Sequence, residues 1–328
     1  MMFRFFIIIA SSAIILPGTD TTLNLKKEKT CKAVAVSNSN NEIISVCNAS
    51  MNQESYYVFD RQLYDYKCDF LPQVIFWRKI MNLTKDSALL TSYSDRQLLS
   101  GVEVKDWEKL GTEAVSRYKD SLRASYCLSD SERILFVEGK RFFYDFEKSF
   151  QNLNDGIRAF RDNGVDPWYA QAILLIESPN KLQKSNAGAY GPFQLMKPVA
   201  RMFGLKVNRL IDERADFSRS AYASSSLLKT ICIPLARTML DTLCISYNEQ
   251  DLWFRLLVMH VYHAGAGNVR AALEKIAPVQ GGMELIATLW HTQAKGFKSS
   301  SQNYSQLALA AMLEMNARLN LSRLSLRD

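Results

Sequence analysis

The chain contains 328 residues, of which 48% are hydrophobic and 22% are charged, as in ordinary soluble globular proteins. This composition excludes a largely disordered chain, and the low Gly and Pro contents exclude collagen-like and proline-rich proteins. The net charge is +7, and it is unevenly placed. Residues 19–150 are neutral, whereas residues 151–328 hold 20 Lys and Arg against 14 Asp and Glu. The second half is therefore expected to prefer an anionic partner.

The N-terminus has the pattern of a secretory signal over residues 1–18. Arg4 precedes an apolar run from Phe5 to Leu16, and Pro17-Gly18 follows it. The run is shorter than the ~20 residues that a transmembrane helix needs. The sequence therefore predicts an exported chain, in the periplasm or cell envelope, with no stable membrane span after cleavage.

The cysteine count of six permits disulfide bonds in an exported protein. The simplest pairs join sequence neighbours, Cys31 with Cys47 and Cys232 with Cys244, and buried free thiols are the alternative. The chain has no Cys-x-x-Cys pair, which disfavours zinc ribbons and thioredoxin-type redox motifs.

The apolar periodicity predicts a mainly α fold, with a largely helical N-terminal region of unknown role over residues 19–150. Residues 19–55 are polar and indicate either little order or a few short strands. Helical patterns then cover about 103–126 and 136–160, and Asn163-Gly164 ends the second of them. A boundary is expected near residue 150. Further helices are predicted over 168–178, 198–203, 216–230, 249–262, 269–276 and 304–319.

Glu177 is the most informative single residue. It ends the apolar run Ala170–Ile176, which should be packed inside the protein. Burial disfavours the charged form of a carboxyl group and raises its pKa, so Glu177 is expected to be protonated near neutral pH. Cleavage of a glycosidic bond requires such an acid, because the leaving oxygen must receive a proton.

Three further motifs follow Glu177-Ser178 along the chain. They are Gly188-Ala189-Tyr190-Gly191-Pro192-Phe193-Gln194, then Tyr262-His263-Ala264-Gly265, then Asn303-Tyr304. Together, in this order, the four motifs resemble those of bacterial lytic transglycosylases with a lysozyme-like domain, and most closely the membrane-bound D-type group. The resemblance covers about residues 155–319. It implies a lysozyme-like transglycosylase domain over residues 151–328.

The resemblance also implies roles for individual residues. Glu177 matches the family's catalytic Glu. The other matched positions would bind or position peptidoglycan glycan strands: Ser178, Gly188, Gly191, Phe193, Gln194, Tyr262, His263 and Tyr304. In this expectation Ser178 and Tyr262 lie beside Glu177 and position it, Phe193 offers an apolar face to a sugar, and Tyr304 lines the cleft. His263 departs from the family, which has Asn at that position, and an imidazole can also carry charge.

The implied reaction cleaves the β-1,4 bond between N-acetylmuramic acid and N-acetylglucosamine and forms a 1,6-anhydro product. It needs no cofactor and one carboxyl group, whereas ordinary glycosidases use two. One alternative is a lysozyme-type hydrolase, for which Asp212 or Asp216 would have to supply the second acid. Another is a catalytically weak glycan-binding scaffold on the same fold.

Other classes of site are disfavoured by the sequence. His260 and His263 lack a carboxylate partner and a His-Glu-x-x-His motif, so no metal site is expected. No run of five or more Lys and Arg indicates nucleic-acid binding. The nucleophile pattern Gly-x-Ser-x-Gly is absent as well.

Overall fold

The computed structural model describes residues 35–36, 41–48, 53–177 and 184–320. These residues belong to one compact unit, residues 32–328, and the other unit, residues 1–31, lies outside the described part. The predicted signal over residues 1–18 and the predicted site residue Ser178 therefore lie outside the described residues.

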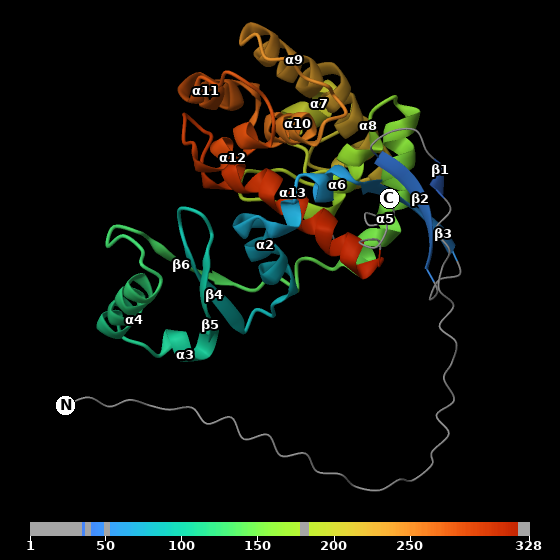
Figure 1. Ribbon diagram of the computed structural model, residues 1–328. Coiled ribbons are helices and arrows are strands. Elements are labelled where there is room, and N and C mark those ends of the chain that lie inside the picture. Colours follow the sequence, from blue (N-terminus) through green and yellow to red (C-terminus); the bar gives the residue numbers. More distant parts are fainter. Residues whose placement is uncertain (1–34, 37–40, 49–52, 178–183, 321–328) are drawn as a thin grey trace, which may run out of the picture. The chain divides into compact units, whose positions relative to one another are not determined.

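The first half of the chain forms two small antiparallel sheets (Figure 1). The first has the order β1-β2-β3, and its strands are β1 (Ala35–Val36), β2 (Asn41–Asn48) and β3 (Gln53–Asp60). The second has the order β5-β4-β6, and its strands are β4 (Ser87–Ser92), β5 (Leu98–Glu103) and β6 (Ile134–Glu138). The short helices of this half are α1 (Gln62–Asp65), α2 (Pro72–Asn82), α3 (Val104–Glu108) and α4 (Thr112–Ser125).

This half is thus a mixture of helices and strands, and the expectation of a largely helical N-terminal region is wrong. Phe136, which the sequence pattern assigned to a helix, lies in β6. There its ring stacks on Trp107 of α3 at a centroid distance of 5.4 Å. Aromatic residues are also common in strands, where they pack under a covering helix. The apolar spacing around Phe136 therefore did not distinguish a strand from a helix.

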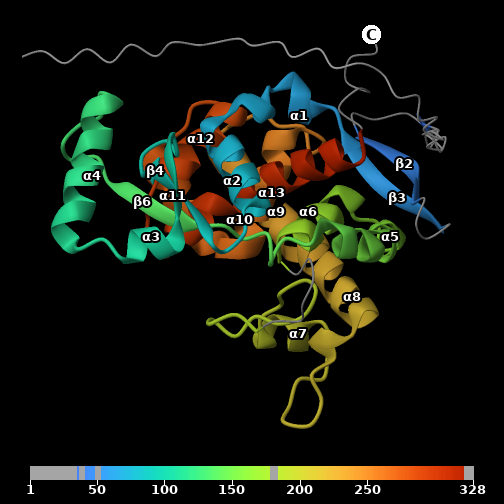
Figure 2. The same cartoon turned by 90° about the horizontal axis from the view of Figure 1, so that it is seen from below.

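The second half is helical, which confirms the mainly α class. Its helices are α5 (Phe146–Asp162), α6 (Pro167–Glu177), α7 (Lys197–Met202), α8 (Phe217–Leu227), α9 (Ile233–Thr242), α10 (Leu252–Ala264), α11 (Ala266–Ile276), α12 (Met283–His291) and α13 (Ser299–Arg318). Figure 2 shows α7 and its flanking loops beside α8, on the side of α6 that faces away from α1. Within the described residues, no helix is long and apolar enough to cross a bilayer.

One buried core joins the two halves. It includes Tyr57 of β3 and Phe76 of α2 together with residues of α5, α6, α10 and α13. α13 packs against α2 and also against α6 and α10. The boundary expected near residue 150 falls inside α5, so it does not divide this core.

Cys68, Cys127, Cys232 and Cys244 are free thiols. Cys232 is buried, whereas Cys244 is exposed, and α9 lies between them. Twelve residues of helical rise amount to about 18 Å, far beyond the ~7 Å that a disulfide allows between Cα atoms. The expected Cys232–Cys244 pair is therefore wrong. The predicted pair Cys31–Cys47 stays a prediction, because Cys31 lies outside the described residues.

Candidate functional site

Helix α6 carries Glu177 as its last residue. Every residue from Trp168 to Ile176 is buried, because the helix lies among β3, α5 and α13. Asp166 accepts a hydrogen bond from the Trp168 backbone N–H at 2.9 Å, and Pro167 begins the helix. A helix that is apolar on all sides belongs in a core, so its last residue, Glu177, is carried to the edge of that core, where it stays partly exposed.

Polar contacts with β3 fix the position of α6. The Gln171 side chain accepts a hydrogen bond from Val58 N and donates one to Val58 O, both at 2.8 Å. Trp168 Nε1 donates to Asp60 Oδ2 at 2.8 Å. Because these groups are fully buried, the bonds fix both the rotation and the height of the helix against the strand.

A buried ionic cluster supports the same end of α6. The Arg255 guanidinium on α10 donates from Nε to Asp166 Oδ2 at 2.8 Å, and its Nη1 lies 3.7 Å from Asp60 Oδ2. Burial raises the pKa of Asp60 to about 6, against the opposing attraction of Arg255. The start of α6 is therefore held by charged and hydrogen-bonding groups that satisfy one another.

Glu177 has different surroundings at the other end of the helix. Burial raises the pKa of its carboxyl group from 4.5 to about 7, and the hydroxyl of Tyr304 lowers it to a smaller extent. The carboxyl group in turn acts electrostatically on Tyr144, Tyr262 and Tyr304. The expected raised pKa thus has its expected cause, and three tyrosines of the described residues are electrostatically coupled to this acid.

The tyrosine expected beside Glu177 makes its hydrogen bonds elsewhere. The Tyr262 hydroxyl donates to Phe193 O at 2.6 Å. Its single proton is used there, so the Ser224 hydroxyl donates to Tyr262 at 3.0 Å. Tyr262 therefore ties α10 to α8 and to the loop that contains Phe193, and it does not orient Glu177 directly.

Tyr304 is the residue best placed to orient Glu177. It is 4% exposed, so it does not line an open cleft as expected. Its hydroxyl is buried and makes no hydrogen bond of normal geometry to a described residue, although it is near enough to lower the pKa of Glu177. Contacts of this kind often tighten only when substrate is bound.

His263 stacks on the Tyr304 ring, with centroids 4.2 Å apart and planes 24° from parallel. Desolvation lowers the pKa of its imidazole below the ordinary value of 6.5, although the residue as a whole is exposed. The ring is therefore neutral at neutral pH, and it is not among the groups that shift Glu177. A stacked neutral ring can hold Tyr304 in place.

The loop that contains Gly188, Gly191 and Gln194 is built around Arg214. This fully buried side chain donates from Nη1 to Gly188 O and to Leu195 O, both at 2.8 Å. Gly191 has φ +88°, and a Cβ atom there would lie 1.8 Å from the Arg214 carbonyl oxygen. Gly191 is thus required by the packing of this backbone, whereas the space beside Gly188 is open.

Gln194 and Phe193, both predicted to contact the glycan, have different surroundings in this loop. Gln194 is partly buried, and its Nε2 donates to Gly191 O at 3.0 Å, so the amide helps to hold the turn. Phe193 is fully buried between Phe160 and Phe217, with ring centroids 5.5 and 5.6 Å away. The expectation that Phe193 offers a face to a sugar is wrong, because its ring belongs to the core.

Neither candidate for a second acid is available in this structure. Asp212 forms a two-pronged pair with Arg214, at 2.9 and 2.7 Å, which holds the pKa of its carboxyl group below the ordinary value. Asp216 caps α8 by accepting from Arg219 N at 2.8 Å. Neither is among the groups that shift the pKa of Glu177.

Sequence reasoning missed three residues around this site: Tyr144, Ser224 and Arg214. Each is buried and far from Glu177 along the chain. Arg214 carried the one usable signal, because Asp212 and Arg214 stand two residues apart in a segment with few apolar residues. Nothing in the local pattern around Tyr144 or Ser224 distinguishes them from ordinary core residues.

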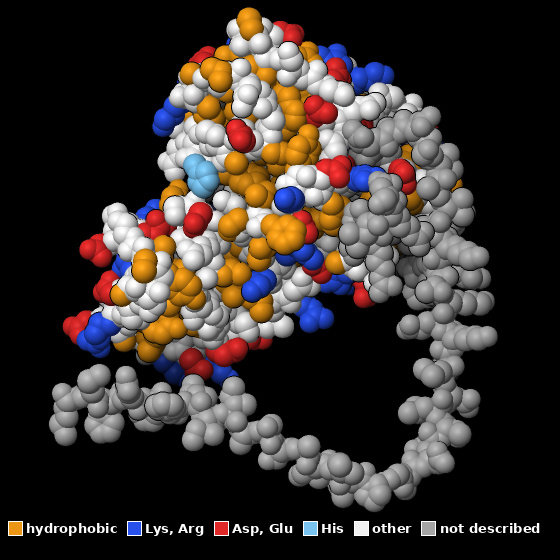
Figure 3. Space-filling view, in the orientation of Figure 1, with side chains coloured by type: hydrophobic (Ala, Val, Ile, Leu, Met, Phe, Trp, Pro, Cys, Tyr) orange, Lys and Arg blue, Asp and Glu red, His pale blue; other side chains and the backbone are white. Residues whose placement is uncertain are grey.

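The described residues show neither a cluster of metal-binding side chains nor, on the face in Figure 3, a patch of one charge. In the described ranges, no three His, Cys, Asp or Glu residues gather as a metal site would require. His260 is buried, and its Nε2 lies 2.9 Å from the Ser305 hydroxyl. On the described part of the face in Figure 3, side chains of both signs are interspersed rather than sorted into one positive patch.

Comparison of the sequence with models of protein families and with curated proteins gives no match.

Proposed function

We propose that this protein is an exported peptidoglycan lytic transglycosylase with a lysozyme-like domain. One observation carries the proposal. Glu177 is a carboxyl group with a pKa of about 7, raised by burial, and no second carboxyl group is among those that shift it. Such a group is protonated and deprotonated with similar ease near neutral pH, which suits an acid that must later act as a base.

In the proposed reaction Glu177 donates its proton to the glycosidic oxygen as the bond from C1 of N-acetylmuramic acid to that oxygen breaks. The N-acetyl oxygen of the substrate stabilises the positive charge that develops at C1. The Glu177 carboxylate then takes the proton of the C6 hydroxyl, whose oxygen bonds to C1 and closes the 1,6-anhydro ring. Atoms and protons balance without water, so the reaction is a lyase reaction.

The surrounding residues have supporting roles in this proposal. Tyr304, held by His263, orients the Glu177 carboxyl group. Tyr262 and Arg214 fix the loop that presents Gly188 and Gln194 to the glycan. A lysozyme-type hydrolase is the rival, and the pairing of Asp212 with Arg214 counts against it, because that carboxylate is already engaged.

Mass analysis of the fragments released from purified peptidoglycan tests the proposal. The expected products carry a 1,6-anhydro end and are lighter by one water than the products of hydrolysis. Glu177→Gln should lower product release by about 10²–10⁴-fold, because it removes the transferable proton and keeps the shape. Glu284→Gln, an equal change at an exposed position on α12, is the control. Hydrolytic products, or more than a tenth of the activity in Glu177→Gln, would contradict the proposal.

A further inference from the structure

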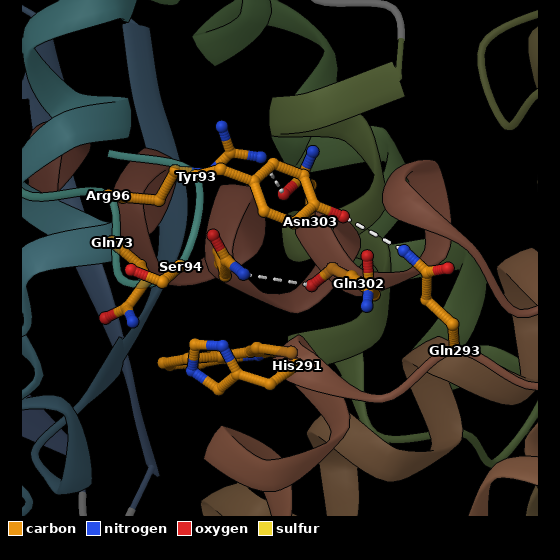
Figure 4. A pocket seen from close by; sticks show the side chains of 10 residues that line it. Gln73, Tyr93, Ser94, Arg96, His291, Gln293, Gln302 and Asn303 are labelled. Carbon is orange, nitrogen blue, oxygen red and sulfur yellow. Dashed lines mark hydrogen bonds between the residues drawn. The ribbon is translucent and has the colours of Figure 1, made fainter. Parts of the chain in front are cut away.

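A polar cavity lies where α2 and the turn between β4 and β5 meet α12 and α13 (Figure 4), and Glu177 is not among the residues that line it. It has a volume of about 90 Å³, which is room for a carboxylate group and the atoms next to it. The side chains that matter in its lining are those of Gln73, Tyr93, Arg96, Gln293, Gln302 and Asn303.

Arg96 is the unusual member of this lining. It is 9% exposed, and its guanidinium lies 5.6 Å from the centroid of the Phe76 ring and 5.9 Å from that of Tyr93. Its one hydrogen bond to a described residue runs from Nη2 to Asn303 Oδ1 at 3.2 Å. A guanidinium has five N–H donors, so most of its capacity remains available to the cavity.

No carboxylate in the described part of the chain pairs with Arg96. Glu132 accepts from the backbone N–H groups of Tyr93 and Ser94 at 2.8 and 2.9 Å. Asp95 accepts from the Ser92 hydroxyl and from Gln97 N. Burial lowers the pKa of Arg96, and the Tyr93 hydroxyl is the only group that opposes this shift. A buried cation without a counter-charge is costly, and an anion in the cavity would remove that cost.

The remaining polar groups suit a ligand that has an amide beside its charge. Gln293 donates from Nε2 to the Tyr93 hydroxyl at 2.9 Å, and Gln302 donates to Thr292 O at 2.9 Å. These bonds hold the two amides at the cavity, as Figure 4 shows for Gln293 and Tyr93. Side-chain amides can both donate to and accept from a peptide group.

We propose that this cavity binds the C-terminal carboxylate of a peptide, with the two carboxylate oxygens on the Arg96 guanidinium and the neighbouring peptide group among the amides. A planar guanidinium favours a planar carboxylate, which it binds through two parallel hydrogen bonds. Asn303 and Tyr304 are consecutive on α13, so the cavity and the Glu177 site use adjacent residues of one helix. Under the proposed function the peptide stems of peptidoglycan would supply this group, but binding itself does not require an active Glu177.

Calorimetric titration of the full chain with acetyl-alanyl-alanine tests the inference. The same peptide with an amidated C-terminus and inorganic phosphate, at equal ionic strength, are the comparison ligands. The free acid should bind saturably and raise the melting temperature, whereas the amide and phosphate should bind at least about tenfold more weakly. Equal binding of acid and amide, tighter binding of phosphate, or no saturable binding of the acid would overturn the proposal.

Three variants assign any binding to this cavity. Arg96→Gln should lose the acid, whereas Arg133→Gln should keep it, because Arg133 is exposed and lies on the Tyr93 ring without lining the cavity. Asn303→Asp should also lose the acid while melting no lower than the parent, because it supplies Arg96 with an internal carboxylate. This variant carries the test if Arg96→Gln does not fold. Undiminished binding in Asn303→Asp would overturn the assignment, and so would undiminished binding in a folded Arg96→Gln. Because these titrations measure no cleavage, their failure is distinct from failure of the proposed reaction.

Discussion

Two carboxyl groups, the buried Asp60 beside the start of α6 and the partly exposed Glu177 at its end, differ in the groups around them. Burial raises the pKa of both, to about 6 and about 7. At Asp60 this rise in pKa is opposed by Arg255, by the Gln62 backbone N–H at 3.0 Å and by the indole of Trp168. At Glu177 the rise is opposed by the hydroxyl of Tyr304. A structural acid is thus surrounded by partners, whereas the candidate catalytic acid has capacity left for a substrate.

Removing the cation at the Asp60 end should have the largest effect on stability. Arg255→Met leaves Asp60 and Asp166 without their shared counter-charge in a buried place. We expect a loss of about 3–5 kcal/mol in the free energy of unfolding, measured by urea denaturation. Arg237→Met, which breaks an exposed pair with Glu249, should cost less than about 1 kcal/mol. Equal losses in the two variants would show that the cluster is not a support of α6.

Neutralising the acid at the other end should not destabilise the protein at neutral pH. The folded pKa of Glu177 lies above its unfolded value, so its stabilising contribution is complete at low pH. That contribution falls as the pH rises from about 4.5 to about 7, where the carboxyl group ionises. Glu177→Gln should therefore equal the parent near pH 4 and exceed it above pH 7 by on the order of 2 kcal/mol. Denaturation curves at both pH values check this, and a less stable variant at neutral pH would instead make Glu177 part of a structural ion pair.

A smaller change should move the pH dependence without removing activity. The Tyr304 hydroxyl lowers the pKa of Glu177, so Tyr304→Phe should raise that pKa and shift the alkaline limb of the pH–rate profile to higher pH. The expected shift is no more than about one unit, because one hydrogen bond is removed. Stability should change little, since the hydroxyl makes no hydrogen bond of normal geometry to a described residue. A downward shift would mean that Tyr304 does not act on the ionised carboxyl group.

The smallest effect on the pH profile is expected at His263. The imidazole is neutral at neutral pH, and it is absent from the groups that shift Glu177. His263→Asn should therefore leave the alkaline limb in place, although it removes the ring that stacks on Tyr304. If the alkaline limb moves to higher pH after this change, the imidazole of His263 must be charged and must lower the pKa of Glu177.

The sequence predicted those features that depend on one helix at a time. The apolar run before Glu177 predicted both the burial of α6 and the raised pKa of its last residue. Asn163 and Gly164 end α5 as expected, with Gly164 at φ +69°. Helix ends and buried faces follow from local residue types, so they can be found without knowledge of the tertiary contacts.

Features that depend on contacts between distant segments were not predicted. Phe193 stands in a loop rich in glycine, and only its contacts with Phe160 and Phe217 place it in the core. The helix expected over 269–276 is α11, which begins three residues earlier, at Ala266 after Gly265 with φ +81°. α9 and α12 were not predicted, and neither begins with a side-chain cap that would mark its start in the sequence. The strands β4 to β6 are short, and each depends on a neighbour for its pairing.

The hydrogen bonds between β3 and α6 determine whether residues 151–328 can be produced as a separate protein. A fragment that encodes residues 151–328 would lack Val58, which satisfies the buried Gln171 amide, and Asp60, which accepts from Trp168. It would also lack Tyr57, whose hydroxyl contacts Asn316 of α13 at 2.7 Å. The segment that resembles a transglycosylase is therefore not a transferable module, and a hybrid protein built from it must also carry β3.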